Sequence, residues 1–456
     1  MMNAESESEE EVLYNLSNGK QYIALQNLEG SHVSPQLKPG LLETPRTSGV
    51  GAIFANLFKC YTGAGLLSLP FAFRYSGVVA GVVCLILVSV MCTVSMVCLV
   101  KCKIHLSKKS SANLTYSDVV LLLLGRKWSI VLDITIIAFQ FGAVVIYFVF
   151  VSENLTPFFS KMSSISARWC WLLFIAPLYI GLSWIRSMKY IGIISFFAEI
   201  SILTGIAVTG VIGCLQLSRK VVPGLAFNVN MTPPWRTLPL MFGMAAFAFE
   251  GAGVVIPSEC SMKKPEKFNK VLVSVLSAAT FMYITFGVLL YTAFGPETGF
   301  TTGQITENLE QFATHMVDRS FWHVMQIVVR LCLVFGIGMS VSVQLIVVLD
   351  IVEKELFKPG RFSQNNLFWK QNLIRAVMTV IGLSLAASGL SFGHLVSLTG
   401  AFSGTLMQFI FPAACYLKCF RDSLSLCQKL GMWLLAICGV IFGGLATYVT
   451  LIEMFS

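Results

Sequence analysis

Long apolar runs recur along the whole chain, and each is long enough to cross a lipid bilayer as a helix of about 20 residues. Only 12% of the 456 residues are charged, whereas a typical soluble domain has about a quarter, so most of the surface cannot face water. The sequence therefore predicts an all-α integral membrane protein with about eleven spans. The expected spans are about 50–73, 77–101, 129–152, 169–185, 190–215, 237–257, 270–294, 321–350, 371–389, 392–417 and 430–453.

The positive charges between the spans predict how the chain is oriented. Of the 32 Lys and Arg residues, 23 fall between spans on the side of the N-terminus and seven on the opposite side. Lys and Arg gather on the cytoplasmic side of membrane proteins, which also explains the net charge of +9. We therefore expect a cytosolic N-terminus and an extracytosolic C-terminus, in the plasma membrane or in a lysosomal or vacuolar membrane.

The polar first segment differs from the rest of the chain. Its early part is rich in Glu, and its composition predicts a disordered cytosolic tail at 1–48, followed by a transmembrane domain at 49–456. Two glycosylation sequons, at Asn154 and Asn230, fall on the predicted outer side. Asn154 is expected close to the membrane, so Asn230 is the better acceptor candidate.

Two spans carry a matched glycine pair with a proline a few residues later. The first contains Thr-Gly-Ala-Gly at 62–65, and the sixth contains Glu-Gly-Ala-Gly at 250–253. Glycine weakens a helix by about 1 kcal/mol relative to Ala, and unwound backbone at membrane depth is tolerated where it is buried or lines a cavity. The freed N–H and C=O groups can hold a carboxylate, an ammonium or a cation. Close helix packing is the alternative explanation for these glycines.

The two interrupted spans stand five spans apart, as expected for an inverted repeat of five helices. The predicted halves are about 49–215 and 237–417, and the helix at about 430–453 is an addition. Glu250 stands against the second interruption, and an ionisable group at that depth is a functional hypothesis by default.

The run LFKCYTGAGLLSLP at 57–70 and the run PWRTLPLMFGMAAFAFEGAGVVIPSECSMKKPEKFNKV at 234–271 resemble the amino acid/auxin permease family. Within that family they look most like the proton-assisted, or proton-coupled, amino acid transporter branch. The resemblance covers about 50–453. It implies a LeuT-type fold with helices 1 and 6 broken, and a symporter that moves small neutral amino acids, often together with protons.

The resemblance also implies one substrate site built from both interruptions and the third span. Its predicted members are Thr62, Gly63, Ala64, Gly65, Tyr147, Phe249, Glu250 and Gly251. The backbone at 62–65 would hold the substrate carboxylate, and Glu250 would lie near the amino group or handle the proton.

One departure from the branch concerns the coupling ion. Asn56 stands where several proton-coupled members have a His, and Asn does not titrate. Sodium is therefore the alternative coupling ion, and Ser340 and Ser342 in the eighth span would offer it hydroxyl groups beside the first interruption. Serine in a helix more often bonds its own backbone.

Several other classes of protein lack support in the sequence. There is no GxxxxGK[ST] nucleotide motif, the five His residues form no metal-ligand pattern, and no paired acid/base or nucleophile set points to an enzyme. We expect no cofactor, no metal and no nucleic-acid partner. The main alternative is an amino-acid sensor of the same fold that signals through its N-terminal tail.

Overall fold

The computed structural model describes residues 46–110, 114–159, 164–185, 188–231, 235–299, 302–356 and 364–455. Within these ranges the regular secondary structure is helical, and one isolated backbone bridge joins Ser48 to Met262. The all-α prediction is confirmed. Residues 1–45 of the expected tail lie outside the described ranges, so the disorder of that tail stays a prediction.

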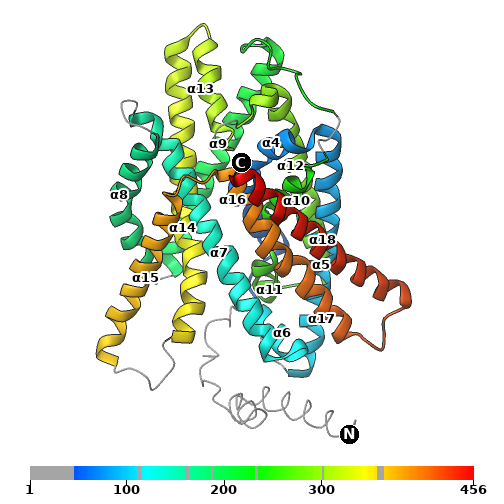
Figure 1. Ribbon diagram of the computed structural model, residues 1–456. Helices are drawn as coiled ribbons and strands as arrows, with labels where there is room; N and C mark the ends of the chain where they lie inside the picture. Colours follow the sequence, from blue (N-terminus) through cyan, green and yellow to red (C-terminus); the bar gives the residue numbers. More distant parts are fainter. Residues whose placement is uncertain are drawn as a thin grey trace.

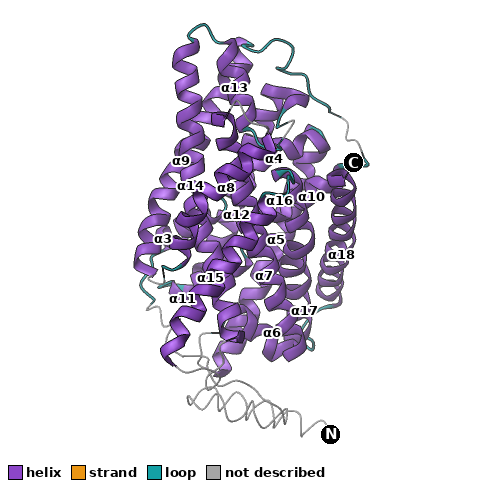
Figure 2. Cartoon of the chain, turned by 60° about the vertical axis from the view of Figure 1, so that its left-hand side comes forward, coloured by secondary structure: helices purple, strands orange, loops and turns teal. Residues whose placement is uncertain are grey.

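The helices form an elongated bundle, with α13 at one end and α6 near the other (Figure 1 and Figure 2). The helices of the first half are α3 (Val50–Cys60), α4 (Ala64–Ser76), α5 (Val78–Ser110), α6 (Tyr116–Leu124), α7 (Arg126–Leu155), α8 (Ser164–Ser183) and α9 (Met188–Arg219). Those of the second half are α10 (Leu238–Ala248), α11 (Ala252–Ser261), α12 (Phe268–Phe294), α13 (Thr306–His315), α14 (Arg319–Leu356), α15 (Gln364–Ala386), α16 (Phe392–Thr399), α17 (Phe411–Cys419) and α18 (Leu426–Phe455).

The helices match the predicted spans in position. Among the described residues, eight helical segments are long and apolar enough to cross a membrane, and α3 with α4 makes a ninth as a pair bent by 50°. The expected spans at about 169–185 and 371–389 are formed by α8 and α15, which fall outside that set. The count of eleven membrane crossings is therefore not confirmed.

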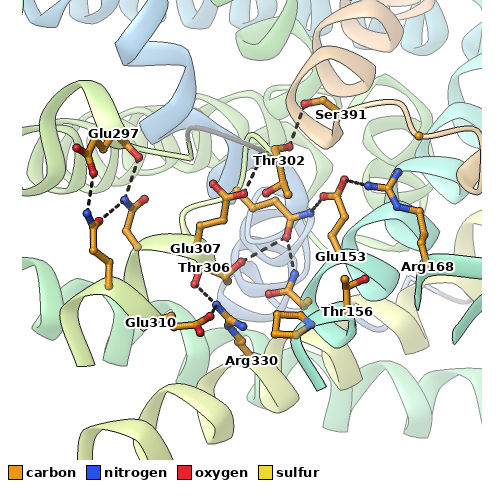
Figure 3. A pocket seen from close by; sticks show the side chains of 16 residues that line it. Glu153, Thr156, Arg168, Glu297, Thr302, Thr306, Glu307, Glu310, Arg330 and Ser391 are labelled. Carbon is orange, nitrogen blue, oxygen red and sulfur yellow. Dashed lines mark hydrogen bonds and ion pairs between the residues drawn. The ribbon is translucent and has the colours of Figure 1, made fainter. Parts of the chain in front are cut away.

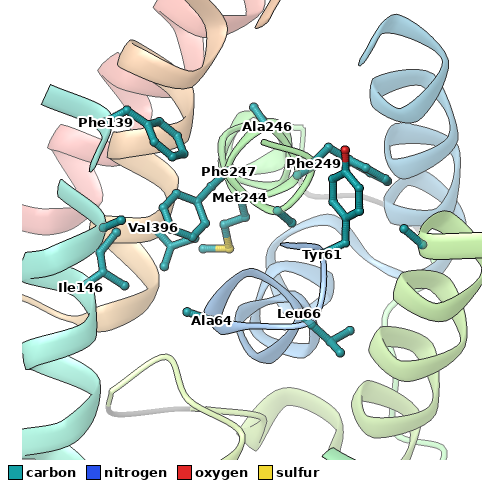
Figure 4. Close-up of a cluster of buried hydrophobic side chains, with 14 of the residues drawn as sticks. Tyr61, Ala64, Leu66, Phe139, Ile146, Met244, Ala246, Phe247, Phe249 and Val396 are labelled. Atoms are coloured by element: carbon teal, nitrogen blue, oxygen red, sulfur yellow. The ribbon is translucent and has the colours of Figure 1, made fainter. Parts of the chain in front are cut away.

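The two interrupted spans are buried very unequally along their length. In α4, 11 of 13 residues are buried, and in α10 nine of 11 are buried. In contrast, α3 buries only two of its 11 residues and α11 five of its ten. The bundle is thus tightly packed around α4 and α10, which lie nearer α13, and more loosely packed around α3 and α11. Figure 4 shows the packed centre, where side chains of α4 and α10 meet those of α7 and α16.

A few polar contacts hold α11 and the segment before α3 in place. Ser48 exchanges two backbone hydrogen bonds of 3.0 Å with the end of α11, donating to Ser261 and accepting from Lys263. Lys103 of α5 forms an ion pair with Glu259 of α11, and both side chains are at least 97% buried. The start of the first span is thereby joined to the end of the sixth, and α11 is joined to α5.

Candidate functional site

The first interruption lies between α3 and α4. Helix α3 ends at Cys60, helix α4 begins at Ala64, and Gly63 between them has extended backbone with φ −169° and ψ −152°. A Cβ placed on Gly63 would meet no atom within 4 Å, so this glycine faces open space. The two half-helices point their adjacent ends at this gap, which leaves carbonyl groups of α3 and N–H groups of α4 without helical partners.

The second interruption lies between α10 and α11 and consists of Phe249, Glu250 and Gly251. Phe249 is fully buried against the ring of Tyr283, with ring centroids 4.9 Å apart. Glu250 is only partly buried, and its Oε1 lies 3.4 Å from the backbone N–H of Gly253 in the first turn of α11. The carboxylate therefore sits at the positive end of a helix dipole, where a negative charge is stabilised.

The two interruptions are packed directly against each other. A Cβ on Gly65 would lie 2.7 Å from Cα of Ala248, and a Cβ on Gly251 would collide with the hydroxyl of Tyr61. Only glycine permits these approaches. Both explanations for the glycines thus hold at different positions: Gly65 and Gly251 allow close packing, whereas Gly63 leaves a space.

The sequence did not predict two residues, Tyr283 and Gln408, that donate hydrogen bonds to carbonyl groups at the ends of the half-helices. The hydroxyl of Tyr283 in α12 lies 2.8 Å from the carbonyl oxygen of Tyr61 and 2.6 Å from that of Ala248, at the ends of α3 and α10. Nε2 of Gln408 donates to the carbonyl oxygen of Ala246 over 2.7 Å. No sequence signal distinguished them from the other polar residues of their spans, although a buried tyrosine hydroxyl or amide needs a hydrogen-bond partner.

Helix α9 holds the first interruption through polar side chains. The hydroxyl of Thr62 donates to the carboxylate of Glu199, and Nζ of Lys59 donates to the backbone carbonyl oxygen of Ser195 over 3.0 Å. Glu199 is thus a further acidic group beside the site. Its partner in the first span could not be inferred from spacing.

The remaining predicted site residues lie on α7 and α14. Nε2 of Gln344 donates to the hydroxyl of Tyr147 over 3.4 Å, which joins the two helices. The hydroxyl of Ser340 donates to the carbonyl of Gly336 over 2.9 Å within its own helix. The hydroxyl of Ser342 is buried and has no partner in the described part of the chain.

The two sequons differ in accessibility. Asn230 is exposed, so its side chain is free to carry a glycan. Asn154 is 2% exposed, and its Nδ2 donates to the carbonyl of Phe150 over 2.8 Å and to Gln304. A glycan on Asn154 is incompatible with this packing, so the structure argues against that acceptor.

A cavity of about 690 Å³ lies elsewhere, where α7 approaches α13, and Asn154 is the one predicted residue that lines it. Among the described residues, no group of three or more His, Cys, Asp or Glu side chains is placed to hold a metal ion.

Comparison with known proteins agrees with this arrangement. The family model described as "Transmembrane amino acid transporter protein" matches residues 46–456. Amino acid transporter ANT1 of Arabidopsis thaliana is 29% identical and aligns with 89% of this chain and 93% of its own length. The proton-coupled amino acid transporter-like protein pathetic of Drosophila melanogaster is 26% identical over 82% of this chain and 77% of its own length.

Vacuolar amino acid transporter 4 of Saccharomyces cerevisiae is 25% identical over 82% of this chain and 53% of its own length. Among solved structures, a sodium-coupled sialic acid symporter superposes with a TM-score of 0.55 at 13% identity, covering 97% of this chain and 96% of that chain. MhsT bound to L-phenylalanine gives a TM-score of 0.50 at 14% identity, covering 87% and 98%. The predicted LeuT-type fold is confirmed, and the chain is a multi-pass membrane protein that belongs to the transmembrane amino acid transporter family, the amino acid/auxin permeases.

Proposed function

We propose that this chain is a secondary active transporter that moves small neutral amino acids across its membrane by alternating access, coupled to protons. The single observation that carries the proposal is the contact between the two interruptions, which brings four helix ends and the carboxylate of Glu250 to one place. Helix N-termini favour a carboxylate and helix C-termini favour an ammonium. The two interruptions together are therefore suited to binding an α-amino acid, which carries both groups.

The substrate carboxylate would be held by the backbone of Thr62, Gly63, Ala64 and Gly65, at the N-terminal end of α4. Phe249, Glu250 and Gly251 would face the amino acid, with Glu250 near its ammonium group, and Tyr147 would contribute from α7. The open space at Gly63 supports this placement, because a small side chain can be accommodated there.

Alternating access is supported by the unequal burial of the half-helices. The more deeply buried half-helices, α4 and α10, lie on the α13 side of the bundle. The less buried half-helices, α3 and α11, lie on the other side. We propose that the looser side is cytosolic, with the N-terminus in the cytosol and the C-terminus outside it. The vacuolar relative favours a lysosomal or vacuolar membrane over the plasma membrane.

Proton coupling would act through Glu250. A bound ammonium stabilises the charged form of a neighbouring carboxylate, and its departure favours protonation. Glu250 would therefore release its proton when the substrate arrives and take one up when it leaves, which exchanges the two in opposite directions, whereas the resemblance to the proton-coupled branch implies symport. The name of the relative pathetic supports protons as the coupling ion, whereas the non-titrating Asn56 favours sodium. The unpartnered hydroxyl of Ser342 is the observation that favours a sodium site, with Ser340 beside it.

The test is uptake of labelled glycine, alanine, proline and tryptophan into proteoliposomes under an imposed pH gradient, then under a sodium gradient. Concentrative uptake of the small neutral amino acids driven by the pH gradient is expected. Uptake driven only by sodium would contradict proton coupling through Glu250 and would favour an ion site at Ser340 and Ser342. Binding without uptake under either gradient would contradict transport and support the sensor alternative.

A further inference from the structure

The two ends of the bundle differ in the side chains that join their helices. At the α13 end, ion pairs line the cavity: Arg168 with Glu153, and Arg330 with Glu310 (Figure 3). Towards the opposite end, α5 packs against α17, and both helices carry cysteines at that contact (Figure 1). Thiols can be oxidised and reduced, so this contact offers a chemistry that the ion pairs do not.

Four cysteines form one cluster between the two helices: Cys98 and Cys102 on α5, and Cys415 and Cys419 on α17. On each helix the two cysteines are four positions apart, so they lie on the same face. The thiols of Cys102 and Cys419 form a hydrogen bond with each other. The cluster therefore contains one pair of thiols in direct contact across the two helices.

The two members of this pair differ in accessibility. Cys102 is 0% exposed, whereas Cys419 is partly exposed and is the last residue of α17. The other two cysteines are less suited to reaction, because the thiol of Cys98 contacts the sulfur of Met432 over 3.8 Å and Cys415 is 0% exposed. A reagent from solution should therefore reach Cys419 first, and Cys102 is the thiol beside it.

Aromatic rings next to the pair hold the two helix ends together. The ring of His105 in α5 packs against Phe420, with centroids 5.2 Å apart, and Phe420 packs against Tyr416 at 5.0 Å. Phe420 directly follows Cys419, and His105 is three positions after Cys102. Reacting groups that are held together before reaction have a high effective concentration, which favours a bond between these two thiols.

The pair lies beside the ion pair that joins α5 to α11. Lys103 follows Cys102 directly and contacts the carboxylate of Glu259 in α11, the half-helix that begins at the second interruption. A covalent bond between Cys102 and Cys419 would therefore connect α17, through one turn of α5, to α11.

We infer that Cys102 and Cys419 are a redox-active pair, which a low-molecular-weight disulfide of the glutathione type converts into a disulfide that suppresses transport. The inference rests on the proposed function, because alternating access requires α11 to move and the new bond would fix it to α17. The pair lies towards the end that we propose to be cytosolic. Cytosolic thiols are normally kept reduced, so the bond would respond to oxidation and would not be a permanent part of the fold.

The reaction is two successive thiol–disulfide exchanges. The sulfur of Cys419 attacks oxidised glutathione, which forms a mixed disulfide and releases one glutathione thiolate. The sulfur of Cys102 then attacks the sulfur of Cys419 and releases the second glutathione thiolate. The two thiol protons end on the two glutathione molecules, so the protein loses two electrons and oxidised glutathione gains them.

The test measures the bond and alanine uptake in the same proteoliposomes, prepared with or without oxidised glutathione on both sides of the membrane. Peptide mapping without reduction gives the fraction of chains in which Cys102 and Cys419 are joined. Uptake should fall in proportion to that fraction, by about tenfold when about nine chains in ten are joined. Dithiothreitol should break the bond and restore uptake.

Two variants each remove one member of the pair. Cys102→Ser and Cys419→Ser should keep the uptake of the unchanged protein and lose its response to oxidised glutathione. The control is Cys427→Ser, at an exposed cysteine of α18, and it should respond as the unchanged protein does. A response that is retained in Cys102→Ser and lost in Cys427→Ser would overturn the assignment. The mapping of the unchanged protein does not depend on whether any variant folds.

Three further outcomes separate this inference from the proposed function. Glutathione that remains attached to Cys419 without joining it to Cys102 would overturn the pair. Joined chains with undiminished uptake would overturn the control of transport and leave the proposed function intact. No uptake by the reduced protein would contradict the proposed function, while peptide mapping would still show whether the pair closes.

Discussion

The first interruption bends its span by 50°, whereas the second bends its span by no more than 40°, although both carry Gly-Ala-Gly. The first is held by α9, where the backbone carbonyl of Ser195 accepts from Lys59 and the carboxylate of Glu199 accepts from Thr62. The second carries its own charged group, Glu250, at the start of α11. The same local sequence therefore serves two purposes: the first interruption offers mainly backbone, and the second offers a carboxylate.

The largest difference between the interruptions should appear when the carboxylate is removed. Glu250→Gln keeps the shape but loses a charge-assisted contact to the substrate ammonium worth about 1.5–3 kcal/mol, so uptake should fall roughly 10- to 100-fold. The remaining uptake should lose its dependence on pH. Initial rates of alanine uptake in proteoliposomes measure both effects, with the exposed Glu266→Gln as the control. Full pH-dependent uptake by Glu250→Gln would remove Glu250 from the mechanism.

The two glycines of the first interruption should respond differently to replacement by alanine. Gly65→Ala places a Cβ against the backbone of Ala248, so overpacking should lower the free energy of unfolding by about 1–3 kcal/mol. Gly63→Ala enters open space, and its unfolding temperature should remain that of the unchanged protein. Thermal unfolding in detergent distinguishes the two variants. Equal loss of stability in both would refute the assignment of packing to Gly65 and space to Gly63.

Tyr283 connects the two interruptions, so its loss should affect both. Tyr283→Phe removes the hydroxyl that faces the carbonyls of Tyr61 and Ala248, and the free energy of unfolding should fall by about 1–2 kcal/mol. Tyr448→Phe, at an exposed position, serves as the control. An unchanged unfolding temperature in Tyr283→Phe would mean that other groups satisfy those carbonyls.

The smallest expected effect belongs to the contact between the first interruption and α9. Thr62→Val removes the hydrogen bond to Glu199 and should lower the free energy of unfolding by about 0.5–1.5 kcal/mol. In the Glu199→Gln background the same change should have a smaller effect, because the bond to a charged acceptor is already weakened. Additive losses in the double variant would show that the two side chains act independently.

The sequence predicted the features that depend on local pattern. Apolar runs placed the helices, and the first glycine of each pair lies in an interruption, whereas the second, Gly65 or Gly253, is already helical. Contacts between distant spans could not be predicted from the sequence. Thr62 and Glu199 are 137 positions apart, and Tyr283 is 222 positions from Tyr61, so nothing in the spacing of the chain relates them. The same holds for the cavity, whose walls come from α7, α13 and α14.

We propose that the substrate binds in the space beside Gly63, and alanine uptake by Gly63→Leu in proteoliposomes tests this most directly. The new side chain meets no atom within 4 Å at its Cβ, so the fold should survive while the space is filled. We predict loss of uptake in Gly63→Leu and normal uptake in the control Gly51→Leu, which repeats the change at an exposed position with no atom within 4 Å. Uptake by a stably folded Gly63→Leu protein at the rate of Gly51→Leu would contradict the account.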